Sequence, residues 1–430
     1  MKNIKQAADL ARLETIEITG YRSCENTKLS PNKDLSILIG INGAGKTNIL
    51  QGIRLLAMST PRRSRHLADE FSHSPEAQII AWFSVNQQKI GLKIKFLLQE
   101  NPIRGSDQVY AQETWNLQSF TNSKAWIDLP PMEIWAESGN LKYLIGANQI
   151  DLIESRFLSN KKLKEWFETS EIISKNAALL GAIESVNAFR ACISYYSASQ
   201  FTDPTKCPSS FEVDEEGRLS ENFSTSTNTH QRFLHSLYSL KKENPEIYDD
   251  YCEFVSRRQL GLVSRITWKE IVLSSNTAEV KSGGSIKKIK KTKTLVIPKI
   301  QVGTSHITFN QLSEGTFKTL ALIFYTFTDS SRLLMVEEPE VCIHHGLLSK
   351  VISTLKSQSA HKQTLVSTHS DQLLDQVEPE NIFVVEMGNN GSQVLNLEKW
   401  LSNNEKRALR DYLAESGTLG EYWKSGGLTR

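Results

Sequence analysis

The chain has 430 residues, 39% of them hydrophobic and 23% charged, a composition that supports one large domain with insertions or two domains. Lysine and arginine number 50 against 48 acidic residues, which excludes an overall positive field that would bind nucleic acid nonspecifically. The five cysteines lack a metal-binding spacing, and there is no apolar signal or membrane-length apolar stretch, so we expect a cytoplasmic protein with no membrane partner.

The N-terminal part is predicted to be a short polar helix followed by strands. Residues 1–13 are polar enough for a surface helix, and residues 14–39 alternate between apolar and polar before ending in an apolar run. Further strands are predicted within 78–98 and, on weaker alternation, within 109–120. The first half of the chain is therefore expected to be rich in β-structure.

A phosphate-binding pattern follows the apolar run at Leu35–Ile39, and a helix-like stretch, 48–58, comes after it. The pattern consists of Gly40, Ile41, Asn42, Gly43, Ala44, Gly45, Lys46 and Thr47. Glycines allow backbone N–H groups to turn toward an anion, and the N-terminus of the next helix adds partial positive charge. Lys46 suits the terminal phosphates and the Thr47 hydroxyl suits Mg²⁺. The sequence therefore predicts that this loop binds a nucleoside triphosphate together with Mg²⁺.

The middle of the chain is predicted to be mostly helical. Apolar residues recur every three or four positions within 151–191, and a strand is expected at 192–198. Residues 202–230 are rich in Ser, Thr, Asp and Pro and are expected to form a poorly ordered loop. A second helical stretch covers 229–258 and is interrupted at Pro245.

A lysine-rich tract at residues 287–293 follows Gly283 and Gly284. A solvated loop between strands is the favoured interpretation, and contact with a phosphate backbone or docking of a partner are the alternatives.

The last third alternates between strands and helices. Helices are predicted at 314–327 and 346–356, and strands at 333–336, 364–367 and 382–386. Such alternation is typical of a parallel sheet with helices on its faces. We expect the strand before the glycine-rich loop to belong to the same sheet.

Polar residues follow two of these apolar strands. Glu337 and Glu338 end the first, where Glu337 can hold Mg²⁺ and Glu338 can polarise an attacking water, although an acidic strand end facing solvent is the alternative. His369 ends the second and can contact a γ-phosphate or serve as a structural hydrogen-bonding group. Ser313 and Gly315 begin an apolar helix and suit either an anion site or a simple N-cap.

In order, the segments GINGAGKT, LSEG, LLMVEEPE and STHS resemble the ABC-type ATPase heads of the RecF, SMC and OLD-like group. The resemblance covers mainly residues 14–60 and 305–387. It is strongest to the small stand-alone AAA family ATPases of prokaryotic antiphage systems, such as the ATPase subunits of PARIS-type or Septu-type defence.

The resemblance implies an α/β ABC-ATPase head with a mostly parallel P-loop sheet flanked by helices, an N-terminal antiparallel β-subdomain and a helical insertion. The implied division is an N-terminal ATPase lobe over 1–200, a helical insertion with a basic loop over 201–300, and a C-terminal ATPase lobe over 301–430. Glu337 stands where many ABC ATPases have aspartate, so its longer side chain favours metal contact through water.

The resemblance also implies roles for single residues. Glu338 and His369 would be catalytic, and Thr47, Glu337 and Gln200 would bind the metal. The nucleotide would be bound by Gly40, Asn42, Gly43, Ala44, Gly45, Lys46, Thr47, Asn48, Arg22, Gln200, Ser313 and Gly315. Ser313 and Gly315 match the ABC signature, which faces the nucleotide of a second copy.

The expected activity is ATP hydrolysis coupled to self-association, as a head-to-tail dimer or a higher homo-oligomer. The expected role is control of a separate effector protein, of which a Toprim-type nuclease is the favoured kind, in antiviral defence. Residues 388–430 are too few for a nuclease domain, so we expect the effector on another polypeptide. The alternative is a RecF-like DNA-repair ATPase that clamps duplex DNA. A transporter subunit is disfavoured because the inserted middle matches no coupling surface.

Overall fold

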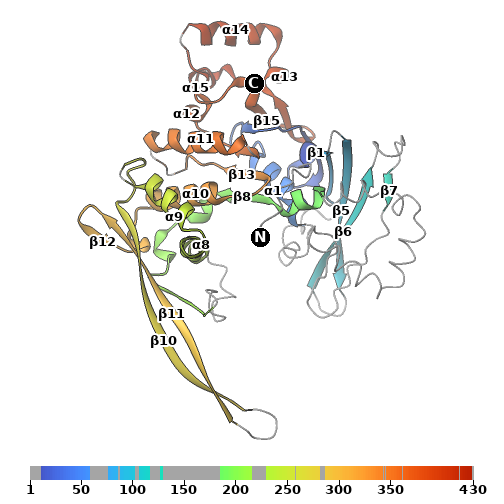
Figure 1. Ribbon diagram of the computed structural model, residues 1–430. Coiled ribbons are helices and arrows are strands. Elements are labelled where there is room, and N and C mark those ends of the chain that lie inside the picture. The colour runs from blue at the N-terminus through green and yellow to red at the C-terminus, as the bar shows by residue number, and fades with distance from the viewer. Residues whose placement is uncertain are drawn as a thin grey trace. The chain divides into compact units, whose positions relative to one another are not determined.

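The computed structural model describes most of the chain, and the two longest segments outside the described part are 59–75 and 129–184 (Figure 1). The described residues are 11–58, 76–85, 88–101, 106–116, 126–128, 185–215, 229–256, 258–280, 286–341, 343, 345–360, 362–415 and 417–428. They fall into two compact units. The first combines Met1–Tyr195, Ser330–Glu337 and Lys356–Arg430, and the second combines Tyr196–Asp329 and Glu338–Leu355. The predicted boundaries at 200 and 300 stay a prediction.

A mostly parallel six-stranded sheet forms the centre of the first unit. Its order is β16 (Gly391–Asn396), β15 (Ile382–Gly388), β3 (Leu35–Ile39), β14 (Gln363–Ser367), β13 (Leu333–Glu337) and β8 (Ile193–Ser197). The pairs β15 with β3, β3 with β14, and β14 with β13 are parallel, while β16 is antiparallel to β15. Strands β3, β13 and β14 are buried throughout, as expected of parallel strands covered on both faces. The expectation that residues 35–39 share a sheet with the C-terminal strands is confirmed.

A second, antiparallel sheet carries the N-terminal strands. Its order is β2 (Cys24–Leu29), β1 (Arg12–Tyr21), β4 (Gln78–Val85), β5 (Gln88–Asn101), β6 (Ser106–Asn116) and β7 (Trp126–Asp128). Strand β4 alternates strictly between half-buried and buried residues, because one face of the sheet packs on the core. The predicted antiparallel β-subdomain is confirmed.

Helix α1 (Lys46–Met58) packs against β1, β2 and β13. The approach is close at Gly52, where a Cβ atom would lie 2.7 Å from Cδ1 of Ile18 on β1. Buried side chains from α1 and both sheets form one continuous apolar core. The start of α1, and thus the end of the glycine-rich loop, is fixed by this packing.

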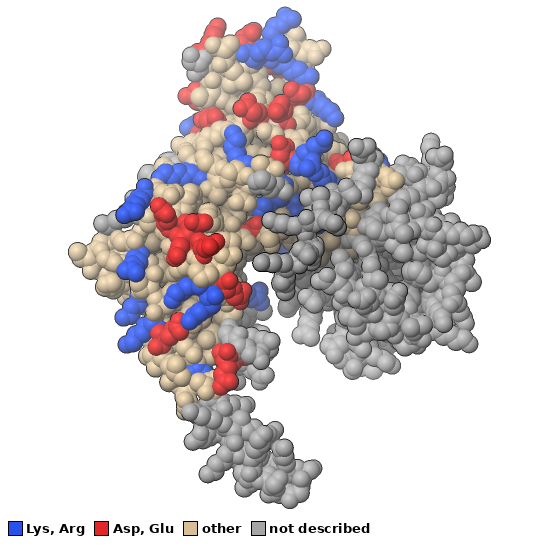
Figure 2. Space-filling model, viewed as in Figure 1, with Lys and Arg blue, Asp and Glu red and all other residues tan. Residues whose placement is uncertain are grey.

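Short elements complete the C-terminal part of the first unit. They are α12 (Asp371–Leu374), η6 (Pro379–Asn381), α13 (Leu397–Trp400), α14 (Asn403–Ala414), α15 (Leu419–Tyr422) and η7 (Trp423–Gly427). None of the described helices is both long and apolar enough to cross a bilayer. Acidic and basic side chains are intermixed on the visible face of the described residues (Figure 2), in keeping with the near-neutral net charge.

Helices around an aromatic core build the second unit. They are α8 (Thr229–Glu243), α9 (Pro245–Val255), α10 (Glu314–Thr328) and the larger part of α11 (His345–Ser359), with η2 (Ala198–Phe201), η3 (Pro204–Lys206) and η5 (Phe309–Gln311). Asn244 caps α9 and Pro245 occupies its first turn, so the predicted interruption at Pro245 is confirmed. Phe233 is fully buried, and the centre of its ring lies 5.6 Å from the ring centre of Phe317 and 5.4 Å from that of Phe324.

A long β-hairpin also belongs to the second unit. Strands β10 (Arg265–Val280) and β11 (Ile286–Val302) pair in continuous register, and β12 (Ser305–Ile307) and β9 (Phe211–Val213) add to β11. The lysine-rich tract at 287–293 lies within β11. The expectation of a loop there is wrong, because cross-strand backbone hydrogen bonds with β10 form a strand despite the charged composition.

The structure also contradicts parts of the predictions for residues 1–13 and 202–230, and the prediction for 151–191 lies mostly outside the described residues. The N-terminal helix was expected to reach Leu13, but Arg12 and Leu13 lie in β1, and residues 1–10 lie outside the described part. The loop expected at 202–230 contains η3 and β9, and Phe211 and Val213 on β9 are buried. Of the predicted helical stretch 151–191, the structure describes only 185–191, which is helical.

Candidate functional site

The loop between β3 and α1 has backbone angles that favour glycine. Gly40, Gly43 and Gly45 have φ values of 155°, 83° and 102°. A Cβ atom on Gly40 would lie 2.3 Å from the carbonyl oxygen of Val385, and one on Gly45 would lie 1.9 Å from Oγ of Ser392. The φ angles favour glycine at all three positions, and the close approach to β15 and β16 requires it at Gly40 and Gly45 as well.

Lys46, the first residue of α1, folds back over this loop. Its Nζ donates hydrogen bonds to the carbonyl oxygens of Gly40 at 2.9 Å and Ile41 at 3.3 Å. The side chain is buried, whereas Asn42 in the middle of the loop is exposed and Ala44 is buried. A buried ammonium group that is hydrogen-bonded to the loop's own carbonyls is placed to meet an anion held by the same loop.

The Glu337 carboxylate at the end of β13 is held by two hydroxyl groups. Thr47 on α1 donates its hydroxyl to Oε1, and Tyr195 on β8 donates its hydroxyl to Oε2. Glu337 is buried, so these hydrogen bonds satisfy a charge that water reaches poorly. The predicted metal ligands Thr47 and Glu337 are thus in direct contact.

Tyr195 was not predicted as a site residue. Burial, followed by the hydrogen bond to Glu337, raises the pKa of its phenol well above the usual value, so the hydroxyl stays a donor at neutral pH. The Arg54 guanidinium lies 5.5 Å from the centre of the Tyr195 ring. In the sequence, Tyr195 is marked only as a polar aromatic residue inside a predicted strand, a feature too common to assign a role.

A polar network supports the loop from the side of β1, β2 and β16. Asn48 on α1 donates from Nδ2 to Oγ of Ser23 at 2.7 Å, and Arg22 donates from Nη1 to Oδ1 of Asn48 at 3.5 Å. The hydroxyls of Ser23 and Ser392 are 2.8 Å apart, and Ser392 is fully buried. The structure therefore brings predicted residues Arg22 and Asn48 together, and adds Ser392, which no local motif marks.

His369 and Ser367 lie at the end of β14. Burial and, to a smaller extent, the nearby positive charge of Lys46 lower the pKa of the His369 imidazole below 6.5. Ser367 pairs with Glu337 in the parallel register, and its buried Oγ has no hydrogen-bond partner among the described residues. His369 is therefore neutral at pH 7, and an unsatisfied hydroxyl lies on the strand beside the carboxylate.

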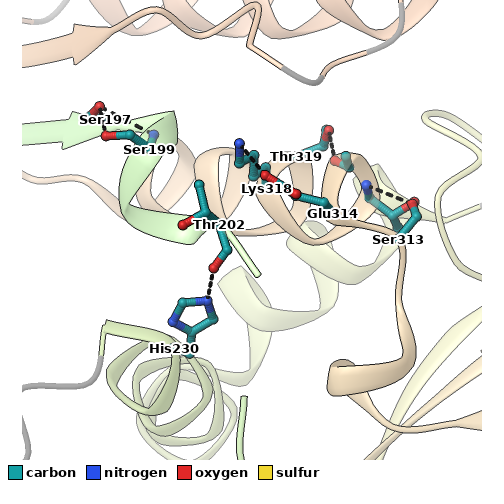
Figure 3. A network of polar contacts seen from close by, with 10 residues as sticks. Ser197, Ser199, Thr202, His230, Ser313, Glu314, Lys318 and Thr319 are labelled. Carbon is teal, nitrogen blue, oxygen red and sulfur yellow. Dashed lines mark hydrogen bonds and ion pairs between the residues drawn. The ribbon is translucent and has the colours of Figure 1, made fainter. Parts of the chain in front are cut away.

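Three predicted site residues lie in the second unit, and Figure 3 shows one of them, Ser313, at the start of α10. Ser313 caps α10, and its Oγ accepts a hydrogen bond from the backbone N–H of Thr316 at 3.3 Å. The carbonyl oxygen of Gly315, one residue into the helix, accepts from Oγ1 of Thr319 at 2.7 Å. Gln200 is half-buried in η2. The N-cap alternative for Ser313 is thus realised in the structure.

Two charged residues, Lys318 and the predicted site residue Glu338, also belong to the second unit. Lys318 is buried and forms an ion pair with Glu314 one turn earlier, at 2.8 Å (Figure 3). Glu338 is half-buried and has a positive φ of 45°, which is uncommon for a residue with a side chain and is frequent at functional sites.

The hydrogen bond from Tyr195 gives a stability prediction. Tyr195→Phe leaves one oxygen of the buried Glu337 carboxylate without its donor and is expected to lower the free energy of unfolding by about 1.5–3 kcal/mol. Urea denaturation measures the change. Tyr196→Phe is the matched control, because the Tyr196 ring stacks on Tyr325 and keeps that contact as Phe. Equal stability of Tyr195→Phe and wild type would contradict the assigned hydrogen bond.

The position of His369 gives a titration prediction. In the folded chain its pKa is expected to lie below 6.5, and Lys46→Met is expected to raise it, because a neighbouring positive charge disfavours the imidazolium form. NMR titration in the absence of nucleotide measures both values, with His369→Gln used to assign the signal. Since protonation is harder in the folded state, the contribution of His369 to stability is lost as the pH falls through 6.5 and below. A pKa above 6.5, or no rise in Lys46→Met, would refute this placement.

Parts of the chain are similar to known proteins. Short stretches are similar to proteins named DNA replication and repair protein RecF. That of Macrococcus caseolyticus is 38% identical over 68 residues, which is 14% of this chain and 18% of the relative. That of Pseudomonas savastanoi is 40% identical over 55 residues, 13% of this chain and 15% of the relative. The chain thus spans less than a fifth of the length of either relative.

Among solved structures, an SMC head bound to the C-terminal winged-helix domain of ScpA is 14% identical with a TM-score of 0.44, covering 90% of this chain and 99% of the other. The SMC head of Thermotoga maritima is 11% identical with a TM-score of 0.38, covering 90% and 98%. The AAA ATPase domain family matches residues 12–374, which is most of the chain. The chain therefore belongs to the AAA ATPase domain family.

Proposed function

We propose that this chain is an ABC-type ATPase that binds ATP and Mg²⁺ at the loop formed by residues 40–47. The observation that carries the proposal is the contact between Thr47 at the start of α1 and Glu337 at the end of β13. The glycine angles of the loop and the buried Lys46 support it, as does membership of the AAA ATPase domain family.

The residues present fit a magnesium ion. Thr47 and Glu337 are oxygen donors of the kind that Mg²⁺ prefers, and the buried Oγ of Ser367 lacks a partner among the described residues. Thr47 and Glu337 would hold the ion, with Gln200 as a third predicted ligand. When bound, the ion would neutralise charge on the phosphates.

The chain's own residues divide the chemical work. Lys46 would donate hydrogen bonds to the terminal phosphates in place of the loop carbonyls. Glu338 would accept a proton from the attacking water, a role that contributes about 10² to 10⁴ in rate. His369, neutral at pH 7 because of its lowered pKa, would donate a hydrogen bond to the γ-phosphate or orient the water.

We propose that hydrolysis is coupled to self-association. Ser313 is exposed at the N-terminus of a 15-residue helix, where the helix dipole favours an anion. Ser313 and Gly315 of one copy would contact the nucleotide bound by a second copy. Two copies would then close over two ATP molecules and separate after hydrolysis.

A substitution of Glu338 tests these steps together. Glu338→Gln is expected to reduce ATP hydrolysis by about 10² to 10⁴ and to accumulate the ATP-bound self-associated form. Sedimentation velocity with and without ATP measures the association. Lys46→Ala is the control that loses nucleotide binding and therefore stays dissociated. Unchanged hydrolysis in Glu338→Gln would remove Glu338 as the base.

We propose that the self-associated form controls a separate effector protein, a Toprim-type nuclease, in antiviral defence. The order of the four ATPase motifs, which resembles stand-alone ATPases of antiphage systems, supports this role. The second candidate is a RecF-like role in DNA repair, supported by the relatives named for DNA replication and repair.

Cells that carry the gene with its native neighbours discriminate the two roles. The defence role predicts fewer phage plaques than with Lys46→Ala, and recovery of a second protein with the chain in pull-downs. The repair role predicts instead that deletion of the gene sensitises cells to DNA damage while plaque numbers stay unchanged. Absence of both protection and a co-purified protein would reject the defence role.

A further inference from the structure

The outer half of the β10–β11 hairpin is a positively charged ribbon. We call residues 273–280 and 286–293 the distal ribbon. It contains five lysines, Lys287, Lys288, Lys290, Lys291 and Lys293, and one acidic residue, Glu279. Its net charge of +4 exceeds the +2 of the whole chain, so the rest of the chain is net negative.

The inner half of the hairpin is tied to the second unit. Trp268 donates from Nε1 to the hydroxyl of Tyr248 at 2.8 Å, and Val296 and Ile300 are fully buried. Strand β9 pairs with residues 294–296 of β11. This half is anchored and is therefore a rigid base for the distal ribbon.

Within the distal ribbon, β10 and β11 pair only with each other among the described strands. Its register runs from Leu273 opposite Lys293 to Val280 opposite Ile286, and β9 ends its pairing with β11 at Thr294. At about 3.4 Å per residue the distal ribbon is about 24 Å long. In Figure 1 the two strands project from the helices of their own unit.

Lysines occupy both faces of the distal ribbon. Since successive residues of a strand alternate between faces, Lys287, Lys291 and Lys293 share one face, and Lys288 and Lys290 share the other. Acidic neighbours among the described residues include Glu279, which lies opposite Lys287 in the register, and Glu212, which pairs with Lys293 at 3.0 Å. Glu215 accepts a hydrogen bond from the backbone N–H of Thr292 at 3.2 Å. A strand that packs one face on a core has apolar residues on that face, so the two-sided charge indicates a ribbon made for an external anionic ligand.

We propose that the distal ribbon binds the phosphate backbone of duplex DNA, with the two strands entering a groove. A major groove about 12 Å wide admits a two-stranded ribbon, and its walls present phosphates to both faces at once. A flat acidic protein surface or an anionic membrane would meet only one face. Binding by lysine to phosphates is independent of base sequence and weakens with salt.

Fluorescence anisotropy with a labelled 30-base-pair duplex of arbitrary sequence tests the proposal on the full chain. The test variant changes Lys287, Lys288, Lys290 and Lys291 to glutamine. The matched control changes four lysines that are exposed elsewhere and removes the same total charge: Lys33, Lys269, Lys299 and Lys399. Two of these, Lys269 and Lys299, lie on the anchored half of the same hairpin.

The test variant is expected to bind the duplex at least tenfold more weakly at 100 mM salt. For the test variant, the slope of log affinity against log salt concentration is expected to be smaller in magnitude by about 3 to 4. Each phosphate neutralised by a lysine contributes about 0.9 to this slope. The control and a variant with the same four distal lysines changed to arginine are expected to bind within about threefold of wild type. The arginine variant keeps the charge and should therefore keep its affinity for the duplex. A thermal melting curve of the glutamine variant shows whether its weaker binding comes from misfolding instead of from the lost charge.

Equal binding by the test variant and the control would overturn the proposal. It would also be overturned if polyglutamate of matched charge, or vesicles of phosphatidylcholine with 30% phosphatidylserine, bound the distal lysines as tightly as the duplex. ATP hydrolysis measured on the same variants keeps the two proposals apart. If the wild-type chain hydrolyses ATP but does not bind DNA, only the proposal of a DNA-binding ribbon is refuted. If it binds DNA but does not hydrolyse ATP, only the proposal of ATPase activity is refuted.

Discussion

Parallel pairing of three buried strands is the constraint on which the candidate site depends. Ser367 on β14 pairs with Leu38 on β3 and with Glu337 on β13. Because parallel strands end at the same edge of a sheet, the glycine-rich loop, the carboxylate and the turn that carries His369 all emerge together. Thr47 can therefore reach Glu337, and Lys46 lies close enough to His369 to lower the pKa of its imidazole.

The loop also depends on small side chains around it. Gly45 approaches Ser392 so closely that a Cβ atom would overlap the serine hydroxyl. Ser392 in turn contacts Ser23, which accepts a hydrogen bond from Asn48 at the start of α1. The hydroxyls of Ser23 and Ser392 thus link the start of α1 to β16 beside the loop. The edge strand of the parallel sheet is thus part of the support of the site.

Local patterns predicted many of the elements and marked candidate site residues, whose roles stay predictions. The glycine spacing, the apolar runs and the polar residues after them each mark their own position, and the strands and helices around residues 35–58 and 314–386 were found where expected. Tyr195 and Ser392 were not found, because their partners are 142 and 369 residues away in sequence. The lysine-rich part of β11 was mistaken for a loop because its stabilising hydrogen bonds come from β10, and composition does not report cross-strand pairing.

The central claim is that the loop before α1, together with Glu337, binds a magnesium nucleotide. Isothermal titration of the chain with a slowly hydrolysed ATP analogue, in the presence of Mg²⁺ and in the presence of EDTA, tests it most directly. The account predicts one nucleotide bound per chain, and at least tenfold weaker binding once the metal is removed. Failure to bind any nucleoside triphosphate under both conditions would contradict it.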